Sequence, residues 1–195
     1  MAFIDDKKKE INCKVVFFGP PLCGKTTTLR QIQRALHKDQ KDTPITLTQG
    51  DDRTLYFDFV PVALGTLQGY TVHLHLYTVP GQKAYEQSRR LIAKGVDGIV
   101  FMADSDLTQM QHNVESFNEL KKICTAEDVD WNELPKVLQY NKRDLDTAVP
   151  VTELTTLLNR DNLPEFETVA TKGSGVMDVL AAVSEKVLLS LKGST

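Results

Sequence analysis

The chain has 195 residues, of which 41% are hydrophobic and 25% are charged, and its formal net charge is −3. This length and composition are ordinary for a globular domain with its own core, and the slight acidity argues against a nucleic-acid partner. No stretch approaches ~18 consecutive apolar residues, so we expect no membrane span.

We expect residues 1–195 to form a single domain, in which residues 1–9 are a flexible or edge segment that exposes the basic run Lys7–Lys9 to solvent. The three cysteines have no paired spacing, which indicates neither a disulfide framework nor a metal site and fits a reducing cytoplasm. Cys13 lies in a strand pattern and Cys124 in a helix pattern, so both should be buried as small hydrophobic side chains.

The first half of the chain begins with a strand pattern at Ile11–Phe18, which is rich in β-branched and aromatic residues. A helix is predicted at Lys25–His37, where apolar residues recur at helical spacing. The polar segment Lys38–Arg53 is typical of a loop. Thr54–Val62 and Tyr70–Val79 follow as the two strands of a hairpin, and the second alternates apolar and polar residues as a half-buried strand does.

The second half continues the alternation of helices and strands. We expect helices at Ala84–Lys94, Leu107–Cys124, Val151–Leu158 and Gly175–Leu191, and strands at Gly98–Met102, Pro135–Tyr140 and Phe166–Ala170. Leu107 should begin the apolar side of the second of these helices. Strands that alternate with helices favour an α/β fold with a mainly parallel sheet flanked by helices on both faces.

A phosphate-binding motif, G-x4-G-K-[ST], stands between the first strand and the first helix, at Gly19–Thr26. Its glycines let the backbone approach phosphate groups, and the N–H groups at the start of the following helix attract an anion. Lys25 should reach the β- and γ-phosphates, and the Thr26 hydroxyl should bind Mg²⁺. The Cys23 thiol is either a packing group of the loop, which we favour, or a reactive thiol at a helix N-terminus. The nucleotide-binding residues expected in this segment are Gly19, Leu22, Cys23, Gly24, Lys25, Thr26 and Thr27.

A second motif, N-K-x-D at residues 141–144, directly follows a predicted strand. The Asp144 carboxylate can accept from N1–H and the 2-amino group of guanine together, whereas adenine offers no such pair of donors. Asn141 suits the N7/O6 side of the base and can tie loops together, and the stem of Lys142 can cover the base plane. The N–H of Ala170 should donate to guanine O6. The base-contacting residues expected are therefore Asn141, Lys142, Asp144, Ala170 and Thr171. The two motifs together predict binding of GTP and GDP.

Long segments around these motifs carry a resemblance to a known family. They are Glu10–Pro20, Asp52–Phe59, His75–Gln82, Lys94–Phe101 and Asn141–Asp144. Over nearly its whole length the chain resembles the Ras-like small GTPases, and within them the MglA family of bacterial cell-polarity and gliding-motility GTPases. The resemblance implies a P-loop NTPase fold of the Ras-like G-domain type, hydrolysis of GTP to GDP and phosphate, and action as a molecular switch.

The resemblance also assigns roles around the third GTPase motif, which reads T-V-P-G-Q at residues 78–82. Gly81 N–H would contact the γ-phosphate, and Gln82 would orient the attacking water. Thr78 replaces the usual Mg²⁺-side aspartate. Asp58 either substitutes for that aspartate or is a strand-end carboxylate paired with a lysine or arginine.

Thr54 resembles the threonine of the first switch, which touches both Mg²⁺ and the γ-phosphate. Arg53 beside it is either a solvent-facing loop charge or, as the resemblance implies, an arginine finger supplied in cis. The implied catalytic residues are thus Gln82 and Arg53, and the implied metal ligands are Thr26, Thr54 and Asp58.

Pro21 departs from the glycine that is usual for this family, because a proline lacks an N–H, fixes φ and adds bulk beside the γ-phosphate. Together with Thr78 it leaves open an alternative function, a GTP-binding scaffold with little or no hydrolysis. A P-loop kinase or ATPase is disfavoured by residues 141–144. The resemblance implies a Roadblock/LC7-type GTPase-activating protein (MglB-like) and polarity or motility effectors as partners. It also implies a cytoplasmic chain that is a monomer alone and is recruited to a cell pole by partners.

Overall fold

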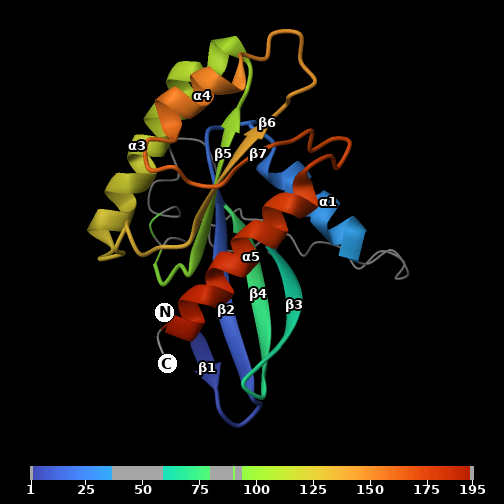
Figure 1. The fold of residues 1–195 in the computed structure, drawn as a ribbon, viewed down its shortest axis with the longest axis vertical. Coiled ribbons are helices and arrows are strands. Elements are labelled where there is room, and N and C mark those ends of the chain that lie inside the picture. The colour runs from blue at the N-terminus through green and yellow to red at the C-terminus, as the bar shows by residue number, and fades with distance from the viewer. Residues whose placement is uncertain (1, 37–58, 80–89, 91–93, 194–195) are drawn as a thin grey trace, which may run out of the picture.

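The computed structural model describes residues 2–36, 59–79, 90 and 94–193, which form a seven-stranded sheet with helices on both sides (Figure 1). The strands are β1 (Phe3–Asp5), β2 (Glu10–Phe18), β3 (Phe59–Leu67), β4 (Tyr70–Thr78), β5 (Gly98–Asp104), β6 (Lys136–Asn141) and β7 (Glu165–Glu167). The helices are α1 (Lys25–Leu36), the 3₁₀ helix η2 (Leu107–Gln109), α3 (Met110–Ala126), α4 (Val151–Leu158) and α5 (Val176–Gly193).

The sheet has the strand order β3-β4-β2-β5-β6-β7, and β1 also pairs with β2. Neighbours from β4 to β7 are parallel, whereas β3 with β4 and β1 with β2 are antiparallel. The α/β fold with a mainly parallel sheet that the sequence predicted is therefore confirmed. Because β2, β5 and β6 are parallel, their carboxyl ends lie at the same edge of the sheet, and the loops that follow them meet there.

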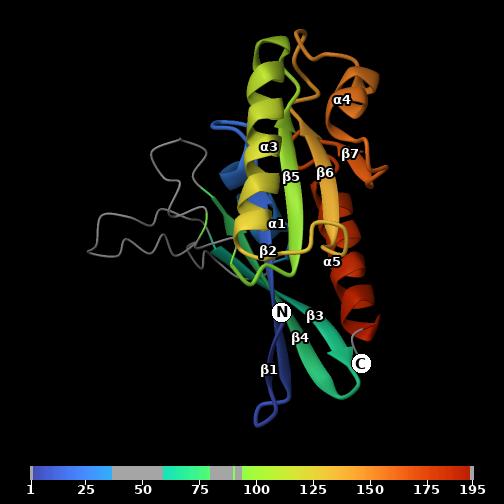
Figure 2. The same cartoon turned by 90° about the vertical axis from the view of Figure 1, so that its left-hand side faces the viewer.

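Among the described residues, two helices cover each face of the sheet, as Figures 1 and 2 show. Apolar side chains of α3 and α4 form one core cluster, and those of α1 and α5 form the other. Strand β2 contributes to both, because Val16 and Phe18 point to the first cluster and Val15 and Phe17 to the second. Every residue of β5 is buried, and so is every residue of its neighbour β6, so the loops that hold the two motifs follow strands of the core.

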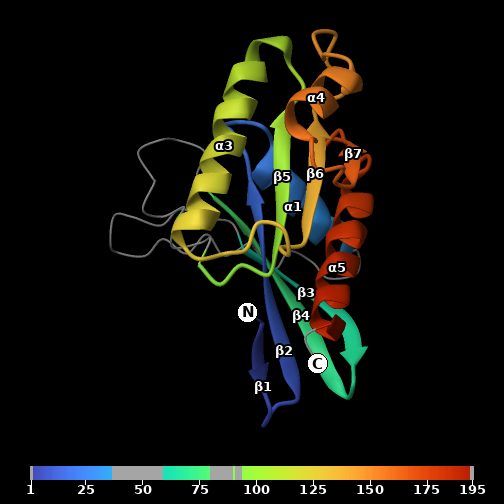
Figure 3. The same cartoon turned by 60° about the vertical axis from the view of Figure 1, so that its left-hand side comes forward.

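One end of the sheet, made of β1, β2, β4 and β3, extends beyond the helices (Figure 3). There the predicted alternation in β4 is confirmed, since Val72, Leu74 and Leu76 are buried at every second position. Strand β1 pairs with the beginning of β2 through a turn in which the Asp5 carboxylate accepts from the N–H groups of Lys7 and Lys8.

Strand β3 is the outermost strand on this side of the sheet, and it is irregular. It contains Pro61, and its register against β4 shifts between Ala63 and Gly65. The connection to β4 is a tight turn at Gln68 and Gly69, both with positive φ, so the turn is later and shorter than the sequence suggests.

Two expectations about element ends are wrong. The strand predicted at Phe166–Ala170 ends at Glu167, because the chain turns back at Val169. Leu107 is 64% exposed and lies in η2 rather than on the apolar side of α3. The cause is the Asp106 carboxylate, which accepts from the N–H of Thr108 at 2.8 Å and caps a separate short helix.

Other predicted elements lie outside the described residues. These are the loop Lys38–Arg53, the first part of the strand Thr54–Val62, and most of the helix Ala84–Lys94. At the end of the latter, Lys94 N–H donates to the Arg90 carbonyl at 3.0 Å. Among the described residues, none of the helices is long and apolar enough to cross a membrane.

All three cysteines are buried, which confirms the expectation for Cys13 and Cys124. Burial raises the pKa of Cys13 to about 12 and that of Cys124 to about 11. Because the thiolate is the reactive form, we expect a disulfide reagent to modify the native protein near pH 8 at least ~100-fold more slowly than the protein unfolded in guanidinium. Absorbance of the released thiol measures both rates. Rapid modification of the native protein would contradict this prediction.

Candidate nucleotide-binding site

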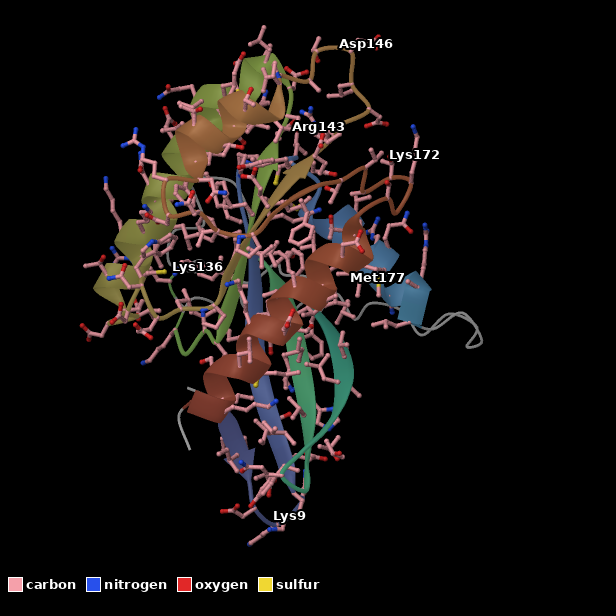
Figure 4. All side chains as sticks on the ribbon, in the orientation of Figure 1. Lys9, Lys136, Arg143, Asp146, Lys172 and Met177 are labelled. Carbon is pink, nitrogen blue, oxygen red and sulfur yellow. The ribbon has the colours of Figure 1, made fainter. Side chains whose placement is uncertain are left out.

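Three loops meet at the carboxyl edge of the sheet: residues 19–24 after β2, residues 142–150 after β6 and residues 168–175 after β7. Figure 4 shows Arg143 of the second loop and Lys172 of the third at this end of the molecule, near the start of α1. The sequence motifs that predicted phosphate and base binding are therefore brought together by the parallel register of the strands.

The loop at residues 19–24 fits closely over the end of β5. A Cβ atom at Gly19 would lie 2.1 Å from the Met102 carbonyl oxygen, so only glycine fits there. The Lys25 side chain is buried, and its ammonium donates to the carbonyl oxygens of Gly19 and Pro20 at 2.9 and 2.7 Å. The predicted phosphate-binding cation thus lies inside the curve of its own loop, at the start of α1.

The exposed part of the same loop consists of Pro21 and Leu22. Leu22 is 89% exposed and has φ +61°, a backbone conformation that residues with a side chain, apart from asparagine and aspartate, rarely adopt. The next side chain, Cys23, is fully buried, and burial raises the pKa of its thiol. Cys23 is therefore a packing residue of the loop, as we favoured, and not a reactive thiol.

The side-chain amide of Asn141 connects all three loops. Its Nδ2 donates to the Cys23 carbonyl at 2.7 Å, and its Oδ1 accepts from the Ala170 N–H at 2.9 Å and from the Thr168 hydroxyl at 3.1 Å. Asn141 itself is only 2% exposed. The expectation that it ties loops together is confirmed.

The N–H of Ala170, which the sequence predicts as the donor to guanine O6, donates to Asn141 Oδ1 in this structure, and its contact with guanine stays a prediction. A backbone amide has a single hydrogen, and here it completes the tether between loops. Ala170 remains part of the wall of the site.

Gly24 lies directly against this tether. A Cβ atom at Gly24 would lie 2.3 Å from Asn141 Nδ2, and its φ of +108° is a conformation that favours glycine. The second glycine of the phosphate motif thus makes room for the first residue of the base motif. Loss of either residue would disturb both loops.

A cleft of about 240 Å³ opens between the loops. Its walls come from residues that the sequence predicted to bind the nucleotide, and from one that it did not, Leu145. The lining residues are Leu22, Gly24, Thr27, Asn141, Lys142, Asp144, Leu145, Ala170 and Thr171. The Asp144 carboxylate lies 3.5 Å from the Lys172 ammonium, and the Thr171 carbonyl accepts from Gln31 of α1 at 3.1 Å.

The two basic residues of the base motif have separate carboxylate partners. Lys142, at φ +65°, places its ammonium 2.6 Å from the carboxylate of Asp104, which is 2% exposed. Arg143 pairs with the exposed Glu167 at 2.8 Å and donates to the Val149 carbonyl at 2.7 Å. Sequence reasoning missed Asp104, since nothing along the chain connects the end of one strand with a motif 38 positions later (142 − 104).

The residues expected around the γ-phosphate and the metal ion lie mostly outside the described residues. They are Arg53, Thr54, Asp58, Gly81 and Gln82. Thr78, which replaces the aspartate of the third motif, is described and is 4% exposed at the carboxyl end of β4. It is in register with Phe17, two residues before the phosphate loop.

A mainly parallel sheet with a phosphate loop after its central strand, and an N-K-x-D motif beside that loop after a neighbouring strand, defines the small GTPases. Comparison with known proteins agrees. The profile of the ADP-ribosylation factor family, Arf, matches residues 1–187.

Two relatives illustrate the range of similarity. The chain is 49% identical over 192 residues to the Mutual gliding-motility protein MglA of Myxococcus xanthus (strain DK1622), covering 98% of each chain. It is 27% identical over 145 residues to the human ADP-ribosylation factor-like protein 4A, covering 74% of this chain and 64% of the relative. The chain belongs to the Arf and Ras-like family of small GTPases, among its MglA members, and is a GTP-hydrolysing enzyme of that class.

The Asn141 tether yields a direct test. In Asn141→Asp, a carboxylate oxygen would face the Cys23 carbonyl where a donor now stands, while the acceptor for Ala170 is kept. We expect the free energy of unfolding to fall by about 2–4 kcal/mol and release of GDP to accelerate. Urea unfolding and fluorescent-GDP dissociation measure the two effects.

Asn159→Asp is the matched control, because Asn159 is also buried and its amide donates to the Leu163 carbonyl at 2.9 Å and to the Glu165 carboxylate at 2.7 Å, away from the cleft. This control should lose stability and keep the GDP dissociation rate. If Asn141→Asp also kept that rate, the tether would have no bearing on nucleotide binding.

Proposed function

We propose that the protein is a GTP-dependent molecular switch that regulates cell polarity or gliding motility. The observation that carries the proposal is the coupling of the phosphate loop to the base motif through Asn141, in a chain 49% identical to a gliding-motility protein over 98% of both chains. In this proposal, GTP orders the segments around Arg53 and Gln82, and hydrolysis releases them.

Base recognition is assigned to the cleft between Asp144 and Thr171. The Asp144 carboxylate stands at its edge, where it would accept from N1–H and the 2-amino group of guanine, and the stem of Lys142 would lie on the base plane. Thr171 also lines the cleft. These assignments are supported by the position of all three residues around one cleft.

Asp144→Asn tests the assignment of the base. An amide in place of the carboxylate offers one acceptor and one donor, which suits xanthine and leaves the guanine 2-amino group opposed by N–H. We expect guanine-nucleotide affinity to fall at least ~100-fold and xanthine-nucleotide affinity to rise. Competition of GDP, XDP and ADP against a fluorescent nucleotide measures all three affinities.

Asp146→Asn, two positions along the same loop, is the control, because Asp146 does not line the cleft. It should keep the guanine preference of the wild type. Unchanged guanine preference in Asp144→Asn, or tight ADP binding by the wild type, would overturn the assignment.

Phosphate binding is assigned to the Gly19–Thr26 loop, with Lys25 as the cation for the β- and γ-phosphates. A Mg²⁺ ion bound with GTP would neutralise charge on the phosphate oxygens. The Thr26 hydroxyl, on the second residue of α1 and only partly buried, is suited to hold it, and Thr54 and Asp58 complete the proposed ligand set.

Hydrolysis is assigned to Gln82, which orients the water, and Arg53, which stabilises the developing charge. Gln82→Leu and Arg53→Ala should each slow single-turnover phosphate release at least ~10-fold while nucleotide affinity stays within a few-fold. Pro21→Gly should raise the rate, because in this proposal the exposed Pro21 ring adds bulk beside the γ-phosphate, where the two catalytic side chains would enter.

Gln111→Leu in α3 and Arg34→Ala in α1 are matched controls on other surfaces, and both should hydrolyse GTP as the wild type does. Equal rates in wild type, Gln82→Leu and Arg53→Ala would contradict the catalytic assignment. Tight GTP binding without turnover in the wild type would support the scaffold alternative suggested by Pro21 and Thr78.

The proposed partners follow from the similarity to MglA. They are a Roadblock/LC7-type activating protein that resembles MglB, and polarity or motility effectors that read the GTP-bound state. In this proposal the protein is cytoplasmic and a monomer when alone, and its partners recruit it to a cell pole. Phosphate release measured with and without a Roadblock protein tests the first of these partners.

A further inference from the structure

Asp104 occupies a special position at the carboxyl end of β5. This strand lies between β2 and β6, so its end stands between the phosphate loop and the base motif, and Asp104 is in register with Asn141. Two hydrogen bonds to the Asn113 side chain of α3 fix the backbone of Asp104. The Asp104 N–H donates to Asn113 Oδ1 at 2.9 Å, and the Asp104 carbonyl accepts from Asn113 Nδ2 at 2.8 Å.

The carboxylate of Asp104 is buried and compensated from two sides. Its Oδ1 accepts from the Asp106 N–H at 3.1 Å, and its Oδ2 lies 2.6 Å from the Lys142 ammonium. A buried carboxylate needs such a partner, because an unpaired charge away from water is costly. Lys142 is the counter-charge that the structure shows for Asp104.

The ion pair fixes Lys142 at both of its ends. The backbone is held in the left-handed conformation at φ +65°, and the ammonium is held by Asp104, while the side chain remains 34% exposed. The four methylene groups between these fixed points belong to a residue that lines the nucleotide cleft. A long flexible side chain is thereby given a single position next to the proposed base.

We propose that Asp104 is a positioning residue for the nucleotide: its buried charge holds the Lys142 stem in place as an apolar wall against the flat face of a purine base. The inference rests on the proposed nucleotide site and adds a residue to it. The ion pair orders the lysine before the ligand arrives, so binding loses less side-chain entropy, and the bound base dissociates more slowly.

The chain provides a matched comparison within the same motif. Arg143, the neighbour of Lys142, also pairs with a carboxylate, but Glu167 is 59% exposed and neither residue lines the cleft. Glu167→Gln therefore removes an ion pair from the motif without freeing a wall of the site. Asp104→Asn keeps the size and the acceptor for Asp106 N–H but abolishes the charge that holds Lys142.

The experiment measures release of a fluorescent GDP by stopped flow from the full chain in the presence of Mg²⁺. We expect Asp104→Asn to accelerate release about tenfold, and Lys142→Ala to do the same by removing the stem. The double variant should release GDP no faster than the faster single variant, because both substitutions remove the same interaction, the Asp104–Lys142 ion pair that positions the stem. Glu167→Gln should stay within about twofold of the wild type.

The affinity for inorganic tripolyphosphate, measured by competition, distinguishes two causes of faster GDP release. Tripolyphosphate has no purine base, so its affinity should fall only if the fold as a whole is loosened. Its affinity should be unchanged in Asp104→Asn and Lys142→Ala. Equal GDP release from the wild type and both variants, additive effects in the double variant, or an equal loss of tripolyphosphate affinity would overturn the inference. If Asp104→Asn does not fold, the GDP and tripolyphosphate measurements on Lys142→Ala decide. Failure of the wild type to bind GDP would instead overturn the proposed function.

Discussion

The side-chain amide of Asn141 is the contact on which the site depends. Its two ends are not interchangeable, since Nδ2 must face a carbonyl and Oδ1 must face an N–H and a hydroxyl. All of these groups are buried, where an unmet hydrogen bond costs far more than at the surface. The phosphate loop, the base motif and the loop after β7 are therefore held in one mutual arrangement, and a change in any of them is transmitted to the others.

Strand β5 supports this arrangement of loops from the core of the protein. It is buried along its whole length, and its carboxyl end meets the loops on both sides. The carbonyl of Met102 fills the space that a side chain at Gly19 would need, and Asp104 holds Lys142. The register of the strands in the core therefore determines which atoms meet at the site. It explains why Gly19 and Gly24 tolerate no side chain.

The sequence was sufficient to predict those parts of the site that are formed by continuous motifs. Residues 19–26 and 141–144 follow strands that periodicity identifies, and parallel strands end at one edge, so their proximity was predictable. The roles of Asp104 and Thr168 were not predictable. Each looks like an ordinary polar residue after an apolar strand until the register of the neighbouring strands is known. The contact of the Ala170 N–H with Asn141 was equally unpredictable, because it too depends on how the two loops lie against each other.

The outer strands affect how the protein behaves at high concentration. An open sheet ends in rows of unpaired N–H and C=O groups, which can pair with another copy of the sheet. Here β3 carries a proline and a register shift, and β7, at the other margin, has only three residues. In the part of the chain that the structure describes, neither of these two strands is a long regular template, so strand addition at β3 or β7 is disfavoured.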